Sequence, residues 1–233
     1  MTRVRLAKFI ADSGVASRRA AEELIVSGAV AVGGVVVTTP VFFVDDGDVV
    51  TVHGRRVEPK TETRLYIFHK PINVMTTAHD PAGRRTIYDA LGAEYKNLKY
   101  VGRLDYKTTG LLLLTNDGVL ARKLTLPSSE IPRTYVAMVG GADMSSLDAA
   151  RRGMTVDGIT YRPMEIDVLG PDTVRVTVRE GKKNEIRIVL RACGHPVRKL
   201  HRISFGPIEL GNLPVGQIRV VPQKSIDALL KSL

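Results

Sequence analysis

The sequence has little that would support a metal-, nucleotide- or disulfide-dependent function. It contains a single cysteine, Cys193, among 233 residues, so no internal disulfide can form and a reducing cytosol is the simplest compartment. Its five histidines show no His-Glu-x-x-His pattern and no cysteine–histidine cluster, so we expect no metal site. Neither a Gly-x-x-x-x-Gly-Lys-Ser/Thr loop nor a glycine-rich dinucleotide motif is present.

Long apolar segments are missing as well. No run approaches the roughly 18 apolar residues that a membrane span needs, and no signal-peptide pattern is found at Met1-Thr2-Arg3. We therefore expect a cytoplasmic protein without a membrane span. What the sequence does contain is 44% hydrophobic residues, enough for a packed core, and a net charge of +10 from 34 Lys and Arg against 24 Asp and Glu. Such an excess favours a polyanionic partner, either nucleic acid or a membrane surface.

The most informative segment spans residues 101–118 and has the sequence VGRLDYKTTGLLLLTNDG. Its leucine run at 111–114 is too short for a helix and lies between Gly110 and an Asn-Asp-Gly turn, which predicts a fully buried strand. Asp105 lies on the loop before that strand, and loops held by a rigid core are where catalytic groups are commonly found. From spacing alone, Asp105 is equally compatible with a catalytic carboxylate and with a carboxylate that caps a turn.

The same segment resembles the catalytic motif of pseudouridine synthases, in the branch that modifies ribosomal RNA and carries an S4 RNA-binding domain at its N-terminus. The matching residues are the Gly-Arg-Leu-Asp sequence at 102–105, Thr108, Gly110 and the LLLLTNDG tail. In that family the aspartate of this motif is the nucleophile, so the resemblance implies that role for Asp105. Residues 203–222 also fit the family's C-terminal pattern, so the resemblance covers nearly the whole chain.

The first 60 residues change from a helical to a strand-like pattern around Gly28. Apolar spacing predicts two short helices, with Gly14 after the first and Ser17 as the N-cap of the second. Alternating valines around the Gly33-Gly34 pair predict a hairpin, and a strand over 49–52 follows the Asp-Asp-Gly turn at 45–47. Two helices before a small sheet resemble an S4 domain of the αL type, which implies RNA binding.

Arg18 and Arg19 adjoin the start of the second predicted helix. The helix dipole and both cations favour an anion there, so we interpret the pair as a grip on RNA phosphates. The alternative is a solvated charged face, which is what two adjacent arginines usually form. The surrounding S4 pattern favours the phosphate contact.

Residues 58–63, with the sequence EPKTET, are polar and contain proline, so they predict a linker. We accordingly expect an S4 RNA-binding domain over residues 1–60 and a pseudouridine synthase catalytic domain over residues 64–233. The strand predicted over 65–68 ends at His69-Lys70-Pro71, which resembles the family's first motif. We interpret Lys70-Pro71 as a turn.

Tyr135 lies at the start of an alternating strand within IPRTYV, residues 131–136. A tyrosine in a strand is more often a core residue than a catalytic one. The resembling family, however, carries an active-site tyrosine at this point, normally after Lys-x, and here Arg133 replaces the lysine, keeping the charge while changing the geometry. The resemblance implies that Tyr135 stacks on the uracil and that its hydroxyl could help to remove the C5 proton.

Two basic segments, EGKKNEIR at 180–187 and HPVRKLHR at 195–202, resemble the family's third motif. In that motif an arginine pairs with the catalytic aspartate and a leucine packs beside the base, which implies these roles for Arg187 and Leu200. The sequence departs from the motif at Lys183, Glu185 and Ile188, where Asn, Gln and Arg are common. These departures weaken an assignment of RNA contacts to the first segment, although Arg187 itself is in place.

The chemistry that the resemblance implies is the conversion of uridine to its C-glycoside. The N1–C1′ bond breaks, the uracil turns and the ring rejoins through C5. A carboxylate can be the covalent catalyst, and no cofactor is expected because neither redox chemistry nor group transfer takes place. Arg187 would supply the opposite charge that keeps the pKa of Asp105 low. The base must first be flipped out of its helix, at a cost of about a few kcal/mol. Arg103 is suited to fill the vacated stack or to hold a phosphate, and Lys182 is a further candidate RNA contact.

We predict an α+β protein in which an S4 module precedes a mixed, largely antiparallel pseudouridine synthase domain. The expected function is site-specific isomerisation of uridine in ribosomal RNA, with 23S RNA favoured over 16S. The expected partner is ribosomal RNA or a ribosomal assembly intermediate, with no membrane, and we expect a monomer. One alternative is a non-catalytic, ribosome-associated RNA-binding protein, against which the Asp105, Tyr135 and Arg187 set argues. Another is a synthetase fragment with an S4 domain, which the missing nucleotide motif disfavours.

Overall fold

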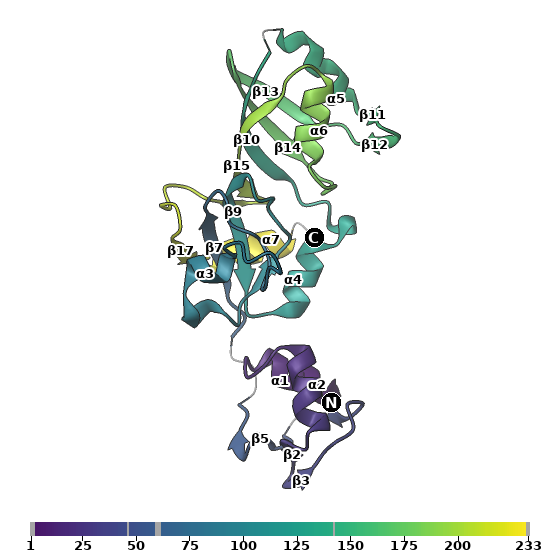
Figure 1. The fold of residues 1–233 in the computed structure, drawn as a ribbon, viewed down its shortest axis with the longest axis vertical. Helices are drawn as coiled ribbons and strands as arrows, with labels where there is room; N and C mark the ends of the chain where they lie inside the picture. The colour runs from purple at the N-terminus through teal and green to yellow at the C-terminus, as the bar shows by residue number, and fades with distance from the viewer. Residues whose placement is uncertain (1–2, 46, 59–61, 142, 232–233) are drawn as a thin grey trace. The chain divides into compact units, whose positions relative to one another are not determined.

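The computed structural model describes residues 3–45, 47–58, 62–141 and 143–231 and divides into two compact units (Figure 1). The smaller unit holds residues 1–64 with 97–99 and 116–118, and the larger unit holds the rest of the chain. Helices are combined with mostly antiparallel sheets, which confirms the predicted α+β class. Asp46 of the predicted Asp-Asp-Gly turn and residues 59–61 of the predicted linker lie outside the described residues. The domain boundaries at 60 and 64 stay a prediction.

The smaller unit contains the two expected helices, α1 (Leu6–Asp12) and α2 (Arg18–Val26). Gly14 follows α1 with a φ of +83°, and Ser17 caps α2 because its Oγ accepts a hydrogen bond from the N–H of Ala20 at 3.2 Å. The strands are β1 (Val4–Arg5) paired with β4 (Phe43–Val44), and a sheet in the order β3 (Val35–Val36), β2 (Val30–Val32), β5 (Val50–Val52) and β6 (Arg55–Arg56). The apolar faces of both helices share one core with the buried valines of this sheet, so the predicted S4-like pattern is confirmed.

The larger unit is built on a sheet that has nine strands within the described residues, with the main order β13-β14-β10-β15-β9-β7-β17. These strands are β7 (Leu65–Lys70), β9 (Thr108–Thr115), β10 (Arg133–Val139), β13 (Glu165–Gly170), β14 (Thr173–Val178), β15 (Val197–Phe205) and β17 (Ile218–Val220), with β8 (Lys99–Val101) beside β9 and β16 (Ile208–Glu209) beside β15. Strands β15 and β9 run parallel, and the other neighbours along the main order are antiparallel. A separate hairpin joins β11 (Met154–Val156) to β12 (Ile159–Tyr161).

Helices lie beside both halves of this sheet (Figure 1). The helices are α3 (Ile87–Leu91), α4 (Gly118–Thr125), α5 (Asp148–Arg152), α6 (Glu185–Ala192) and α7 (Gln223–Lys231), and three short 3-10 turns span Ala93–Tyr95, Pro127–Ser129 and Met144–Leu147. Leucines of β9 pack with β7, α4 and α7 in one core, and residues 111–114 are fully buried, as the leucine run predicts. This rigid strand lies directly after the loop that carries Asp105.

The parallel pairing of β9 with β15 depends on a glycine. Gly110 lies opposite Arg202 with a φ of +104°, and a Cβ at this position would lie 2.2 Å from the carbonyl oxygen of Arg202. Only glycine accepts both the backbone conformation and this close approach. Gly110 therefore lets β15 run alongside the start of β9, which places the middle of β15 next to the Asp105 loop.

Candidate active site

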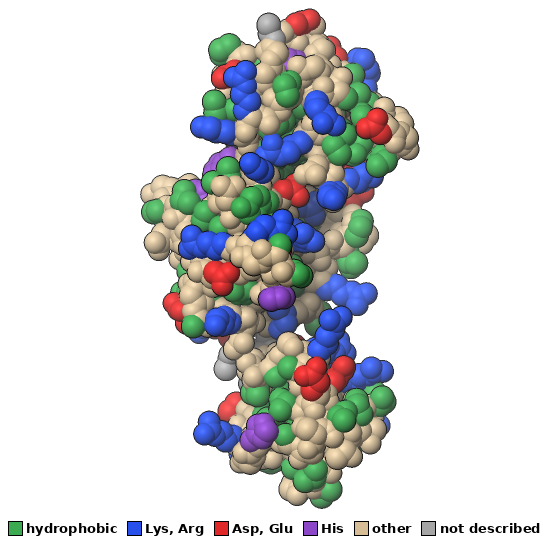
Figure 2. All heavy atoms as spheres, viewed as in Figure 1, with side chains coloured by type: hydrophobic (Ala, Val, Ile, Leu, Met, Phe, Trp, Pro, Cys, Tyr) green, Lys and Arg blue, Asp and Glu red, His purple; other side chains and the backbone are tan. Residues whose placement is uncertain are grey.

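A cleft of about 580 Å³ opens in the larger unit. Its lining comes from the loop before β9, from β10, from β15 and from the segment that leads into α6. The lining includes six residues that the sequence singles out, Arg103, Asp105, Tyr135, Lys182, Arg187 and Leu200. Figure 2 shows Lys and Arg side chains around a hollow in this unit. The volume suits a small ligand or a single nucleotide base, since ligand pockets typically measure about 300–1,000 Å³.

Two side chains that lie far away in the sequence hold the backbone of the loop that carries Asp105. The hydroxyl of buried Thr76 donates to the carbonyl of Leu104 at 2.8 Å and accepts from the Leu104 N–H at 3.3 Å. The ammonium of Lys70 donates to the carbonyls of Asp105, at 3.3 Å, and of Thr108, at 2.9 Å. The side chain of Asp105 is exposed. The backbone on both sides of the carboxylate is therefore fixed, while the carboxylate itself faces water.

Lys70 corrects the sequence interpretation. A turn does follow at Ile72 and Asn73, but Lys70 is the last residue of β7 and is fully buried, so reading it as a turn residue was wrong. Burial lowers the pKa of Lys70 to about 8, and the charge of Asp105 acts in the opposite direction. The available signal was a lysine ending an apolar strand, where its ammonium must find acceptors inside the protein.

Arg187, in the first turn of α6, reaches the Asp105 loop from the other side. Its guanidinium donates to the carbonyl of Val197 at 3.1 Å and to the carbonyl of Lys107 at 3.0 Å. Burial lowers the pKa of Arg187, while the charge of Asp105 raises it. The two charges thus interact, and the hydrogen bonds of Arg187 go to backbone carbonyls. Arg187 ties α6 and β15 to the loop that carries the carboxylate.

Tyr135 is buried on β10, and its ring faces a guanidinium that the sequence analysis missed. The guanidinium carbon of Arg202 lies 6.0 Å from the centre of the Tyr135 ring and 5.6 Å from that of Phe205, close enough for cation–π attraction. Arg202 also donates from Nε to the carbonyl of Leu111 at 2.7 Å, which links β15 to β9. Arg133 lies over Phe205 at 5.3 Å, and burial lowers its pKa. Tyr135 therefore lies beside the Arg202 guanidinium, while Arg133 lies over the neighbouring Phe205 ring.

The three remaining candidate contact residues, Leu200, Arg103 and Lys182, differ in their burial and in their partners. Leu200 is buried on β15 between Ala137 of β10 and Thr108 of β9, so it forms part of the cleft floor. Arg103 is exposed. Lys182 is exposed too, but its ammonium donates to the carbonyl of Thr160 at 2.7 Å and pairs with Glu180. The charge of Lys182 is thus partly neutralised within the protein.

Arg18 and Arg19 belong to the smaller unit and do not line the cleft. Both are exposed in the first turn of α2, beside the Ser17 cap. Across the part of the chain that the structure describes, no group of three His, Cys, Asp or Glu side chains is arranged to hold a metal ion. Within that same part, every helix is too short or too polar to cross a membrane.

Comparisons with known proteins match both parts of the chain. A sequence profile for RNA pseudouridylate synthase matches residues 64–192, and a profile for the S4 domain matches residues 4–50. An uncharacterized RNA pseudouridine synthase of Rickettsia conorii is 37% identical over 227 residues, covering 96% of this chain and 98% of the relative. Ribosomal large subunit pseudouridine synthase B of Bacillus subtilis is 38% identical over 232 residues, covering 97% and 95%. A crystal structure of a pseudouridylate synthase superposes with a TM-score of 0.70 at 27% identity, covering 97% of this chain and 99% of that one.

Proposed function

The chain belongs to the RNA pseudouridine synthase family, and we propose that it isomerises one specific uridine of ribosomal RNA with Asp105 as the nucleophile. The observation that carries the proposal is the meeting of Asp105, Tyr135 and Arg187 at one cleft, although they are far apart in the sequence. The reaction is an isomerisation, so atoms balance without a co-substrate. The N1–C1′ bond breaks, a C5–C1′ bond forms, C5 loses its proton and N1 ends protonated.

Asp105 meets the geometric needs of a nucleophile. Its carboxylate is exposed to an incoming base, while Thr76 and Lys70 hold its backbone in place. A fixed backbone keeps the reacting oxygen near its target, which lowers the entropic part of the barrier. We propose that the uracil itself displaces water from Asp105 on entering the cleft. Arg187 then stabilises the ionised carboxylate as water leaves.

The neighbouring residues suit the handling of a flipped base. Tyr135 lines the cleft, which supports stacking on the uracil and removal of the C5 proton by its hydroxyl. Leu200 packs beneath the same space. Because a base inside a helix cannot reach Asp105, the target nucleotide must turn out, and exposed Arg103 can fill the vacated stack or hold a phosphate.

The large subunit RNA is the favoured substrate. The Bacillus subtilis relative is named for the large ribosomal subunit and matches almost the full chain, which supports 23S RNA over 16S. We propose ribosomal RNA or an assembly intermediate as the partner, a monomeric enzyme and a cytoplasmic location. Mapping pseudouridines in both ribosomal RNAs, from cells with and without the protein, tests this choice. A site lost from 16S RNA alone would contradict it.

The test of Asp105 is Asp105→Asn, which keeps the shape of the side chain but removes the nucleophile. Turnover, measured as tritium released from C5-labelled uridine in ribosomal RNA, should fall below detection while RNA affinity stays within about twofold. The matched control is Asp157→Asn, an exposed aspartate on the β11–β12 turn, which should retain full turnover. If Asp105→Asn turned over at the wild-type rate, Asp105 would not be the nucleophile. If wild type released no tritium from any ribosomal RNA, the non-catalytic alternative would be favoured.

The test of the smaller unit is the double variant Arg18→Ala with Arg19→Ala. Each lost phosphate contact should reduce the slope of log K against log salt by roughly 0.7 to 0.9, so RNA binding should weaken and become less salt-dependent. The kcat should stay the same at saturating RNA. The pair Arg55→Ala with Arg56→Ala, also exposed in this unit, provides the control. An equal loss of slope in both variants would mean that the α2 arginines form no special phosphate grip.

A further inference from the structure

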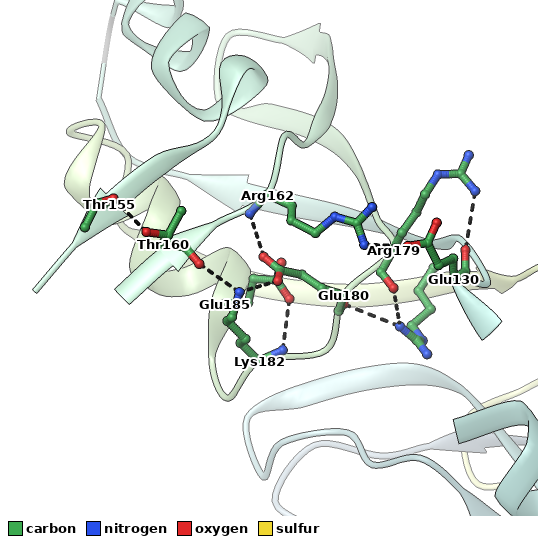
Figure 3. Close-up of polar contacts among 9 residues, drawn as sticks. Glu130, Thr155, Thr160, Arg162, Arg179, Glu180, Lys182 and Glu185 are labelled. Carbon is green, nitrogen blue, oxygen red and sulfur yellow. Dashed lines mark hydrogen bonds and ion pairs between the residues drawn. The ribbon is translucent and has the colours of Figure 1, made fainter. Parts of the chain in front are cut away.

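Two glutamates, Glu180 and Glu185, line the cleft and lie side by side (Figure 3). Glu180 follows β14, and Glu185 is the first residue of α6. Glu185 is only 5% exposed, and both glutamates accept hydrogen bonds from Lys182, Glu185 from its backbone N–H and Glu180 from its ammonium. Two carboxyl groups this close cannot both be ionised without a large repulsion. A proton on one of them removes this repulsion and gives that carboxyl group a donor.

Both carboxyl groups hold the segment 181–184, which connects β14 to α6 along the cleft. Glu185 accepts from the backbone N–H of Lys182 at 3.2 Å, and Glu180 accepts from the ammonium of the same lysine. Glu180 also accepts from the backbone N–H of Arg162 at 2.7 Å, and Lys182 continues to the carbonyl of Thr160 at 2.7 Å (Figure 3). These contacts fasten the segment to β12 and to Arg162, the residue that follows it.

One oxygen of Glu185 is left without a donor. Its Oε1 is buried, and no described residue donates to it. A buried acceptor in this state is destabilising, and more so when it is charged. A proton held between Glu185 and Glu180 removes the charge from the buried group and supplies the donor that the pair lacks. The geometry therefore favours a singly protonated pair.

The difference in burial and in hydrogen-bond donors decides which carboxyl group keeps the proton. Burial, together with the charge of Glu180, raises the pKa of Glu185 to about 8. Burial acts to raise the pKa of Glu180 as well, but hydrogen bonds from Lys182 and Arg162 outweigh it and lower that pKa. Lys182, Arg162 and Arg133 of β10 are the cations that face Glu185, and all three favour its ionisation. Burial nonetheless prevails, so at neutral pH Glu185 is the protonated partner.

We propose that Glu185 is a positioning residue for the isomerisation, and that the proton it shares with Glu180 holds residues 181–184 and the start of α6 in the reactive arrangement. Arg187 is two residues further along α6 and tethers the Asp105 loop through the carbonyl of Lys107. Loss of the shared proton places two negative charges in one buried site and drives the α6 start away from β14. The tether on the Asp105 loop then shifts with it. The inference rests on this cleft being the site of the proposed reaction.

Glutamine is the amide isostere of a protonated glutamate, so Glu185→Gln tests whether the proton on Glu185 is needed. Glu185→Gln keeps one donor and one acceptor and cannot ionise, so it should keep kcat within about twofold of wild type at pH 7. In wild type, kcat should fall about tenfold per pH unit above pH 8, while KM changes little. In Glu185→Gln this fall should disappear. Glu185→Ala, which can neither donate nor accept, should lose at least tenfold in kcat at every pH.

Three further measurements separate the alternatives. Lys70 also has a pKa of about 8, so an alkaline fall that persists in Glu185→Gln would assign the effect to Lys70 and overturn the proposal. A folded Glu185→Gln enzyme that is inactive at pH 7 would also overturn it, because a carboxyl group would then be needed for its acidity. Carbon-13 NMR of glutamate carboxyl groups should show a signal that titrates near pH 8 and is absent in Glu185→Gln. Parallel assays of Asp105→Asn report on the nucleophile alone, so failure of either idea is recognised independently.

Discussion

The two walls of the cleft are held in different ways. The loop that carries Asp105 is fixed by Thr76, Lys70 and Arg187, all of which donate to backbone carbonyls. The opposite segment, 181–184, is fixed by the carboxyl groups of Glu180 and Glu185. A hydroxyl and a guanidinium keep their donors throughout the physiological range, and an amine that loses one proton still has two. A protonated Glu185 has a single donor, and ionisation removes it.

The two walls should therefore differ in how they respond to a change of pH. The backbone of the proposed nucleophile, Asp105, is held by Lys70 and Thr76 through hydrogen bonds that survive a change of pH. The opposite wall depends on one proton and on the cations around it. Arg187 links the two walls because it belongs to α6 and donates to the carbonyl of Lys107 on the Asp105 loop. Loss of the Glu185 proton would therefore reach this loop through Arg187, although Lys70 and Thr76 keep their bonds.

The largest effect should come from Lys70→Met, which breaks the support of the Asp105 wall. Methionine has a similar volume but leaves the carbonyls of Pro71, Asp105 and Thr108 without their donor. We expect the free energy of unfolding to fall by about 3 kcal/mol or more, since each buried acceptor without a partner costs about 1–3 kcal/mol. The kcat should drop more than tenfold. Lys107→Met, an exposed lysine on the same loop, serves as the control in urea unfolding and turnover assays, and equal losses in both would contradict the assignment.

The pH dependence of stability should separate the two walls by sign. The pKa of Lys70 is lowered from 10.5 to about 8, so the unfolded state binds more protons between these values and the contribution of Lys70 to stability rises with pH there. The pKa of Glu185 is raised from 4.5 to about 8, so its contribution falls as pH rises from 4.5 to 8. Urea unfolding across pH 5–9.5 should show that Lys70→Met removes the alkaline rise and Glu185→Gln the acidic-side fall. Opposite assignments would refute this reading.

A middle-sized effect is expected from Thr76→Val, an isosteric change in the same support. The N–H and carbonyl of Leu104 lose their partner, which should lower the free energy of unfolding by about 1–3 kcal/mol. The kcat should fall severalfold because the residue before Asp105 becomes less fixed. Thr77→Val is the matched control, since the Thr77 hydroxyl donates to the nearby carbonyl of His79 and not to the Asp105 loop. A Thr76→Val enzyme with unchanged stability and kcat would show that this hydrogen-bonded pair is dispensable.

The smallest effect should come from Lys182→Met, which changes the charge beside Glu185 on the wall formed by residues 181–184. The Lys182 ammonium is half-exposed, so the free energy of unfolding should change by less than about 1 kcal/mol. The variant removes a cation that favours ionisation of Glu185, so the alkaline fall of kcat should move to higher pH. Lys183→Met, its exposed neighbour, should leave the profile in place. A shift to lower pH in Lys182→Met would contradict the proposed proton sharing.

Much of the fold followed from local patterns. The leucine run predicted β9, and the Gly14 and Ser17 signals predicted where α1 ends and α2 begins, because these features depend on neighbours a few residues away. The resemblance at 101–118 selected Asp105 for the same reason, since its motif is contiguous. Lys70 was misread because the acceptors of its ammonium lie 35 and 38 residues further along the chain. Arg202 was missed because its partners are set by the parallel pairing of β15 with β9.

The family, the order of most elements and the proposed reactive carboxylate of Asp105 could all be read from the sequence. The groups that hold Asp105 in place could be found only in the tertiary structure. The same is true of the groups that titrate near neutral pH. The reason is physical: helix caps, strand alternation and motif spacing are set by interactions within a few residues, whereas burial is set by the packing of distant segments. Glu185 is an ordinary acid in the sequence, and it becomes a proton carrier only because Glu180 and a closed protein interior surround it.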